Sequence, residues 1–345
     1  MVNRILFAFV KLFTLCLLLL VVSSCVSIER LSTNIQTLAS PDKITGLPAK
    51  ANIAIVASIY VDTRHDSMKE RGFPNDSLML VKAAFALKNK LEESPKYAGY
   101  DFPIYSLPRM EIEQNREQLS PEDIAMVSAS ANAQYLISIE YLKADLWHIR
   151  GRGIDEEYGI YSFVRTIVPS EAVFRIYDVA AGTVLDEKIV GDTLVYETVR
   201  SPYESIGSAL SRMPDPVNAV PVACERLAFQ YADRIAPKWL EEVRYYYSTS
   251  NSNADMNFAA SCVRRGQWSE AVKTWMKYVD DSDVQLATIA RFNLALGCEM
   301  MGEYELAIEW LQSVKLKNPK YYSPIYENML KARIDEKTTI DKAMK

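Results

Sequence analysis

The chain has 345 residues, of which 49% are hydrophobic and 24% charged, and its formal net charge is −5. This composition is ordinary for a folded protein of roughly two domains and gives no indication of long disordered segments. An acidic chain has no general electrostatic attraction for nucleic acid or for an anionic membrane surface. We therefore expect no nucleic-acid partner, and we expect any membrane attachment to depend on lipid.

The first 25 residues have the pattern of an export signal. Arg4 and Lys11 flank a short apolar run that ends in small residues before Cys25. A basic start, an apolar core too short for a membrane span and small residues at the end predict a signal peptide over residues 1–24. Residues 22–25, Val-Ser-Ser-Cys, resemble a bacterial lipobox. The resemblance implies acyl chains on Cys25, a stable membrane anchor; the alternative is a plain signal peptide with a chance cysteine.

Residues 25–50 mix Ser, Thr, Asn and Pro with isolated apolar side chains. This pattern predicts a tether or a lead-in that follows the edge of the folded body. Glu29 is followed directly by Arg30. In the bacterial lipoproteins that this chain resembles, surface export is associated with several acidic residues just after the lipidated cysteine. This chain has one acid followed by a base, so we favour the periplasmic face of the outer membrane over the cell surface.

Residues 51–237 are predicted to form an α/β (α+β) layer domain with a mixed sheet. The nearly continuous apolar run over residues 52–60 is typical of a central strand covered on both faces. Further strands are predicted at residues 102–107, 134–147, 163–177 and 184–196, and helices from Asp76, from Ser120-Pro121 and over residues 221–236. Residues 151–159 are expected to form a mobile hairpin tip. This order of elements indicates a compact layered domain.

Two segments near the C-terminus match each other at a shift of 36 residues. The shift places Ala259 on Ala295, Cys262 on Cys298 and Gly266 on Gly302. A repeat of this length with apolar residues at helical spacing predicts two helix-turn-helix units and a capping helix within residues 238–345. Each glycine follows a first helix, where a left-handed backbone conformation is favourable.

These segments resemble the tetratricopeptide repeat. The motif positions are Leu294, Ala295, Gly302, Tyr304, Ala307 and Pro319 in the second unit and Gly266, Trp268 and Ala271 in the first. The second unit has Arg291 where the family has an aromatic residue, and the first has Asp283 where the closing proline would fall. The resemblance implies an all-α repeat domain that contacts other proteins, and the alternative is an ordinary pair of helical hairpins.

Three cysteines would remain after loss of Cys16 and lipidation of Cys25: Cys224, Cys262 and Cys298. An odd number cannot pair fully within one chain. Equivalent positions in neighbouring repeats put the Cα atoms of Cys262 and Cys298 about 8–10 Å apart, beyond the disulfide limit of about 7 Å. We expect Cys262 and Cys298 to be small buried apolar side chains.

Three consecutive tyrosines occupy residues 245–247. Adjacent residues on a helix point about 100° apart, so the three cannot all face one core. At least one is expected to contact solvent, a neighbouring domain or a partner.

No group of residues indicates catalysis. His65 and His148 are the only histidines, and His65 lies in a polar loop where a solvated side chain is the simpler interpretation. Residues 151–153, Gly-Arg-Gly, are too short to cradle a phosphate and have no helix behind them. The acids Asp155 and Glu156 could serve hydrolysis only if held apart in a cleft. We therefore predict no enzymatic activity, no cofactor and no bound metal.

The combination of lipobox, α/β body and repeat pair resembles an uncharacterised family of Bacteroides-type lipoproteins over almost the entire chain. The resemblance implies no particular activity. We predict a lipid-anchored cell-envelope protein that acts as a protein–protein interaction or assembly module, with another envelope protein as its partner. A glycan-binding lipoprotein of a polysaccharide-uptake system and a hydrolase without a recognised motif remain as alternatives, and the oligomeric state is left open.

Overall fold

The computed structural model describes residues 27–345 apart from 61–75, 110–116, 158, 202 and 251–252. The chain divides into two compact units. The α/β unit comprises Leu38–Trp239 with Thr338–Lys345, and the helical unit comprises the residues up to Thr37 with Leu240–Lys337. Cys25 and His65 lie outside the described residues, so lipidation remains a prediction.

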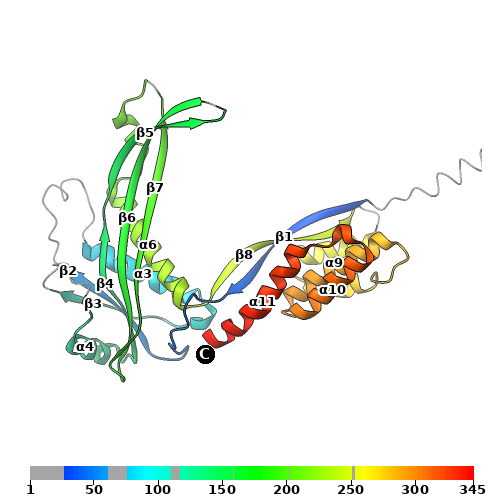
Figure 1. Cartoon of the computed structure of the whole chain (residues 1–345). Helices are drawn as coiled ribbons and strands as arrows, with labels where there is room; N and C mark the ends of the chain where they lie inside the picture. The colour runs from blue at the N-terminus through cyan, green and yellow to red at the C-terminus, as the bar shows by residue number, and fades with distance from the viewer. Residues whose placement is uncertain (1–26, 61–75, 110–116, 158, 202, 251–252) are drawn as a thin grey trace, which may run out of the picture. The chain divides into compact units, whose positions relative to one another are not determined.

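The α/β unit is built on a mixed six-stranded sheet (Figure 1). Its strands are β2 (Ile53–Tyr60), β3 (Ile104–Arg109), β4 (Tyr135–Ala144), β5 (Trp147–Asp155), β6 (Gly159–Asp178) and β7 (Thr183–Arg200). β2 pairs in parallel with β3 and β4, whereas β4, β5 and β7 each pair antiparallel with β6. The predicted α/β class with a mixed sheet is confirmed.

Helices cover both faces of this sheet. The helices are α3 (Asp76–Glu92), α4 (Pro121–Ala131), α5 (Ile206–Leu210) and α6 (Pro216–Ile235), with a 3₁₀ turn η1 (Pro95–Tyr97). Ile53 and Ile55 of β2 pack in the core beneath α3 and α6, while Ala54 and Val56 pack in the core that includes Val127 of α4. The predicted central strand, covered on both faces, is therefore confirmed.

Local sequence signals explain where two of these helices begin. Ser120 Oγ accepts a hydrogen bond from the N–H of Asp123 at 3.1 Å, and Pro121 opens α4, as predicted. α6 begins at Pro216 rather than at the predicted Pro221, because Asp215 caps the earlier start through the N–H of Asn218 at 2.9 Å.

The segment after β4 differs from the prediction. β4 ends at Ala144 and a separate strand, β5, pairs with β6 through Asp155, so residues 151–155 are strand rather than hairpin tip. The rings of Phe163 and Tyr161 on β6 lie over Gly151 and Gly153, where an added Cβ would meet ring carbons at 2.5 Å. Cross-strand aromatic packing compensates for the weak strand preference of glycine.

Asp186 of β7 is a buried carboxylate held by three donors. Its Oδ1 accepts hydrogen bonds from Lys43 Nζ at 2.6 Å and Arg234 Nη2 at 3.1 Å, and its Oδ2 accepts one from the Tyr231 hydroxyl at 3.1 Å. Burial alone would raise the pKa of Asp186, but the hydrogen bonds from Arg234 and Lys43 outweigh burial and hold this pKa below its ordinary value.

We expect this carboxylate to make the α/β unit acid-sensitive. A carboxyl group with a lower pKa in the folded than in the unfolded chain contributes stability fully above its unfolded pKa, about 4, and loses it as pH falls through the folded pKa. Asp186→Asn should therefore be less stable than wild type at about pH 7 and lose less stability on going to about pH 3. Urea unfolding at a series of pH values measures both; identical pH dependence in the two proteins would contradict the assignment.

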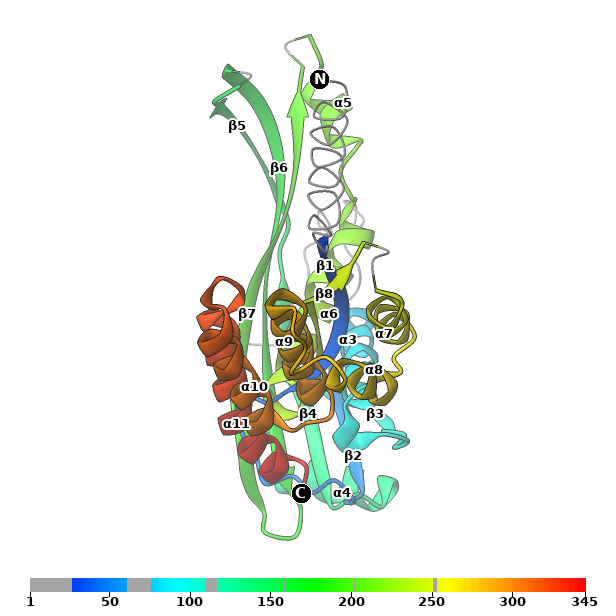
Figure 2. The ribbon, with the colours of Figure 1, turned by 90° about the vertical axis from the view of Figure 1, so that its right-hand side faces the viewer.

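The helical unit contains two helical hairpins and a final helix (Figure 2). Its helices are α7 (Ala254–Arg264), α8 (Trp268–Met276), α9 (Val284–Met300), α10 (Tyr304–Lys317) and α11 (Pro324–Ala343), with a 3₁₀ turn η2 (Pro319–Tyr321). Gly266 and Gly302 follow α7 and α9 with φ of +70° and +77°. The prediction of two helix-turn-helix pairs with a left-handed glycine in each turn is confirmed.

The motif residues of the two pairs divide between two cores. Trp268, Ala271 and Leu294 pack in the first, and Ala295, Tyr304 and Ala307 pack in the second. α9 therefore lies between both cores. Pro319 begins η2. Cys262 and Cys298 are buried and form no disulfide, as predicted, and Cys224 is buried as well.

The expected all-α composition of residues 238–345 and the expected tether were both wrong in part. β8 (Lys238–Thr249) pairs with β1 (Ile28–Ala39) in a two-stranded sheet. This sheet packs on α7, α8 and α9 through Tyr246 and Leu31. The apolar residues in 25–50 thus belong to a strand that finds its partner far away in sequence.

The tyrosines at 245–247 were expected on a helix and instead lie on β8. Successive side chains of a strand point to opposite faces, so Tyr246 is buried at 1% exposure and Tyr245 is 45% exposed. The Arg30 guanidinium lies 3.8 Å from the Tyr245 ring centroid. Tyr247 packs edge-on against Phe292 at 5.0 Å between ring centroids.

Candidate functional site

Three strands of the α/β unit continue past α3 and α6 as an extension, here called the arm (Figure 1). The arm consists of β5, residues 159–167 of β6 and residues 195–200 of β7. Its register aligns side chains in rows across the three strands. Because neighbouring rows point to opposite faces, the arm has two distinct surfaces.

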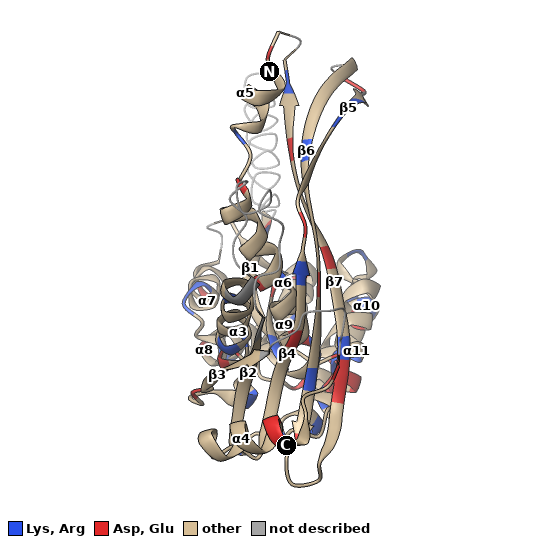
Figure 3. Cartoon of the chain, turned by 90° about the vertical axis from the view of Figure 1, so that its left-hand side faces the viewer, with Lys and Arg blue, Asp and Glu red and all other residues tan. Residues whose placement is uncertain are grey.

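The first surface, the apolar face, is made of three rows and a terminal pair. The rows are Trp147, Ile167 and Val195; Ile149, Arg165 and Glu197; Gly151, Phe163 and Val199; and the pair is Gly153 with Tyr161. Trp147, Ile149, Val195 and Val199 are 47%, 39%, 50% and 59% exposed. Of the charged residues on the arm strands (blue and red in Figure 3), only Arg165 and Glu197 belong to these rows. A contiguous exposed apolar surface of this kind is typical of an interaction site.

The side chains of the apolar face are held in place by one another. The Arg165 guanidinium lies 4.2 Å from the Phe163 ring centroid and forms an ion pair with Glu197. The Tyr161 and Phe163 ring centroids are 6.1 Å apart, and both rings rest on glycines of β5. A surface whose side chains are already ordered loses little conformational entropy on binding.

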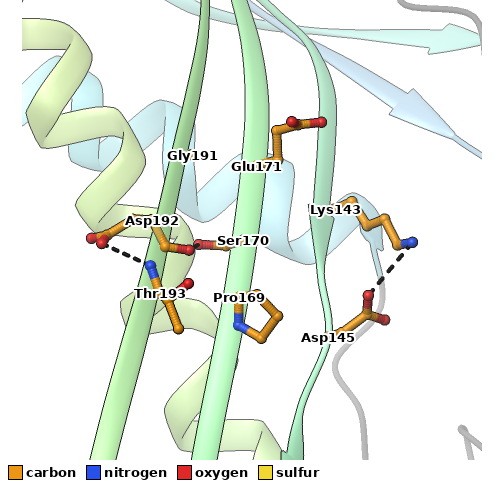
Figure 4. A pocket seen from close by; sticks show the side chains of 8 residues that line it. All are labelled: Lys143, Asp145, Pro169, Ser170, Glu171, Gly191, Asp192 and Thr193. Carbon is orange, nitrogen blue, oxygen red and sulfur yellow. Dashed lines mark hydrogen bonds and ion pairs between the residues drawn. The ribbon is translucent and has the colours of Figure 1, made fainter.

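At the base of the arm, the same face of the sheet has a hollow of about 560 Å³. Its lining comprises Lys143, Asp145, Pro169, Ser170, Glu171, Gly191, Asp192 and Thr193 (Figure 4). Gly191 has no side chain, so the backbone of the sheet forms the floor of the hollow at this point. Lys143 is paired with Asp145 at 3.5 Å, and Asp192 bonds through Oδ2 to Arg226 at 2.8 Å and Gln230 at 2.9 Å.

The lining groups of the hollow do not converge. Figure 4 shows Glu171 directed away from the Lys143–Asp145 pair, with Asp192 on a different strand. The Ser170 hydroxyl donates to the backbone carbonyl of Asp192 at 3.4 Å, whereas an activated serine nucleophile donates to a basic side chain.

The residues considered for chemistry from sequence are not brought together. His148 is exposed on β5, with Nδ1 3.0 Å from Thr166 Oγ1, and Glu156 is exposed in the turn after β5. The side chain of Asp155 lies outside the described residues. Within the described ranges no cluster of three His, Cys, Asp or Glu side chains could hold a metal ion. In the same ranges no helix has the length and apolar character needed to cross a membrane.

Sequence reasoning missed the arm. The period-two pattern of β5, in which Trp147 and Ile149 alternate with His148 and Arg150, was present in the sequence. The glycines at 151 and 153 concealed it, because they suggest a turn when their cross-strand partners are unknown.

Two family models match the chain. The first, described as a domain of unknown function (DUF8603), matches residues 50–247, which include the whole arm and the hollow. The chain belongs to the DUF8603 family. The second, described as a domain of unknown function (DUF6340), matches residues 257–334, from α7 into α11. No curated protein sequence matches the chain.

Solved structures resemble parts of this DUF8603 protein at low sequence identity. The dodecamer of a PelC point variant from Paraburkholderia phytofirmans is 14% identical, with 59% of this chain and 98% of that chain covered and a TM-score of 0.26. The hypothetical protein CT253 from Chlamydia trachomatis is 12% identical, with coverages of 53% and 94% and a TM-score of 0.24. A putative neuraminyllactose-binding hemagglutinin homolog from Helicobacter pylori is 8% identical, with coverages of 56% and 83% and a TM-score of 0.23.

Proposed function

We propose that this DUF8603 protein is a non-catalytic interaction or assembly module of the cell envelope and that the apolar face of the arm receives a protein partner. In this proposal acyl chains on Cys25 hold the chain at the outer membrane, on the periplasmic face. The helical hairpins, which resemble tetratricopeptide repeats, supply a further contact surface.

The observation that carries the proposal is the exposed apolar face. Trp147 and Val199 are among its exposed residues. The Tyr161–Phe163 ring pair and the Arg165–Glu197 ion pair lie on the same face. Charged residues of the hollow, Lys143 and Glu171, border it at the base. An apolar centre with a polar rim is the anatomy of a protein–protein interface. This arrangement therefore favours a protein partner.

The two alternatives from sequence receive less support from this geometry. A sugar site needs hydrogen-bonding side chains beside its aromatic groups, whereas the charged row of the apolar face, Arg165 and Glu197, is already paired with itself. A hydrolase needs an acid and a base held at a cleft, and Glu156 lies exposed in a turn.

The test compares two adjacent residues that point to opposite faces of β5. Trp147→Ser removes an anchor from the apolar face, and His148→Ser changes an exposed residue of the other face in the same strand. Because buried interfacial tryptophans commonly contribute about 2 kcal/mol or more, we expect Trp147→Ser to reduce partner recovery by about 30-fold or more. His148→Ser should recover the partner as wild type does.

Recovery is measured by quantitative mass spectrometry after capture of the full chain from gently solubilised membranes. Sedimentation of the purified protein is the second measurement: self-association that is lost in Trp147→Ser would identify a second copy as the partner. Equal recovery with the two variants would exclude the apolar face as the docking surface.

A further inference from the structure

The opposite surface of the arm, here called the basic face, gathers three arginines. Arg152 of β5 and Arg200 of β7 lie in one row with Ser162 of β6 between them, and Arg150 lies one row nearer the base on β5. Two strand spacings, about 10 Å, separate Arg152 from Arg200. Arginine side chains are long enough to close this distance from both sides.

These arginines border one cavity. Arg150, Arg152, Ser162 and Arg200 line a space of about 300 Å³, together with Gly151, Phe163 and Ile206, the first residue of α5. The lining contains three cations, one hydroxyl and no acid. In a chain with a net charge of −5, this local excess of positive charge is not a consequence of composition.

The guanidinium groups are not neutralised within the part of the chain that the structure describes. Arg150 and Arg152 make no ion pair or hydrogen bond through their side chains there, and Arg200 donates only to the backbone carbonyl of Glu204 at 2.7 Å. The Glu204 carboxylate is itself paired with Arg212, whose Nη2 lies 3.2 Å from Oε2. The nearby acid is therefore already bound elsewhere.

Other acids of the arm lie farther along β5. Glu156 and Glu157 follow Asp155 in the hairpin turn, and Asp155 has the strand parity of Gly151 and Gly153, opposite to that of Arg152. Four residues of strand place Glu156 about 13 Å from Arg152, which is beyond the Debye length of about 8 Å at physiological ionic strength. These acids therefore screen the cluster only weakly.

We infer that the basic face binds an anion of the phosphate type, either free or as the headgroup of a lipid. Guanidinium groups donate paired N–H bonds that match the oxygens of phosphate. Three of them around one cavity provide more donors than a single carboxylate accepts, and the Ser162 hydroxyl adds another. Gly151 and Gly153 lie beneath aromatic rings, so the recognition uses side chains rather than a glycine-rich loop.

The experiment titrates the full chain with inorganic phosphate in a calorimeter. Wild type is expected to bind saturably, and Arg152→Gln should weaken binding about tenfold or more, because hydrogen bonds between charged groups are strong. Arg200→Gln, on another strand, should weaken binding to the same extent. It tests the same site if Arg152→Gln does not fold. Arg152→Lys should recover only part of the loss, because an ammonium cannot form the paired bonds of a guanidinium.

The control is Lys188→Gln, which removes an exposed cation from the same face of β7 far from the cavity. Saturable binding in this variant should equal that of wild type. Absence of saturable phosphate binding in wild type, or equal weakening in Lys188→Gln, overturns the inference.

Vesicles distinguish the two sources of the anion. Vesicles that contain phosphatidylglycerol are compared with phosphatidylcholine vesicles, to which an acyl anchor would bind equally well. A preference for phosphatidylglycerol that Arg152→Gln abolishes assigns the site to a lipid headgroup. Phosphate binding without this preference assigns it to a free phosphate compound. Both results are independent of partner recovery through the apolar face.

Discussion

Replacing Arg175 by methionine is expected to destabilise the α/β unit by about 3–5 kcal/mol, because it leaves a buried carboxylate without its cation. Arg175 is 4% exposed and Glu140 is fully buried, and the two form an ion pair. Glu140 also accepts a hydrogen bond from the Tyr177 hydroxyl, and Arg175 Nε donates to Glu187 at 2.7 Å. Burial raises the pKa of the Tyr177 phenol well above its ordinary value, so this group stays a donor.

Glu140 lies at a β-bulge of β4. The register between β4 and β6 shifts between Ile139 and Tyr141, which leaves Glu140 as the extra residue. Successive side chains of a strand alternate between its faces, so Glu140 lies on the same face of β4 as Ser138, whose partner on β6 is Arg175. The carboxylate consequently lies beside Arg175, and the pair fixes the register of the long β6 strand against β4.

Arg165→Met is the matched control for Arg175→Met. Arg165 lies on the same strand and the same face, but its ion pair with Glu197 is 39% and 32% exposed. Exposed pairs contribute at most about 1 kcal/mol, so this variant should be nearly as stable as wild type. Urea unfolding followed by circular dichroism measures both; similar losses in the two variants would show that the buried pair contributes no more than a surface pair.

Replacing Gly297 by valine is expected to destabilise the helical unit by about 2–3 kcal/mol through overpacking. Gly297 lies on α9 where α8 approaches it, and a Cβ added there would overlap Val272 Cγ2 and lie 3.5 Å from Trp275 Cζ3. Val272 is β-branched and has little freedom to rotate away, and Trp275 is fully buried. The helices would have to separate.

Val272→Ala should reverse the effect of Gly297→Ala on the stability of the helical unit. In a Val272→Ala background the obstructing methyl group is absent, so Gly297→Ala should stabilise the unit by up to about 1 kcal/mol through the better helix propensity of alanine. In the wild-type background the same Gly297→Ala change should be destabilising. Thermal or urea unfolding of the four proteins measures this; additive effects would mean that the close approach of α8 and α9 does not constrain position 297.

Features that depend on neighbouring residues could be predicted from the sequence. The central strand β2, the start of α4 at Ser120-Pro121 and the glycine turns at Gly266 and Gly302 each have a local cause, namely continuous apolarity, capping chemistry or a left-handed backbone. The tetratricopeptide likeness was also readable from local spacing, and its place in a repeat family remains a prediction.

Features that depend on a distant partner could not be predicted. β1 becomes a strand because β8 pairs with it, and β8 follows most of the α/β unit in sequence. Glycines 151 and 153 are strand residues only because Tyr161 and Phe163 cover them. The basic face joins Arg152 to Arg200 through the register of three strands. No local pattern contains that information.

If Cys25 carries acyl chains as proposed, the early start of β1 limits the distance between the chain and the membrane. Ile28 already belongs to the strand, so only two residues, Val26 and Ser27, separate it from Cys25, a span of at most about 10 Å. A free segment of about 25 residues would have reached about 80 Å. The segment between the anchor and the two-stranded sheet would then be too short to let the sheet move far from the membrane. A partner of the helical unit must then bind close to the lipid headgroups.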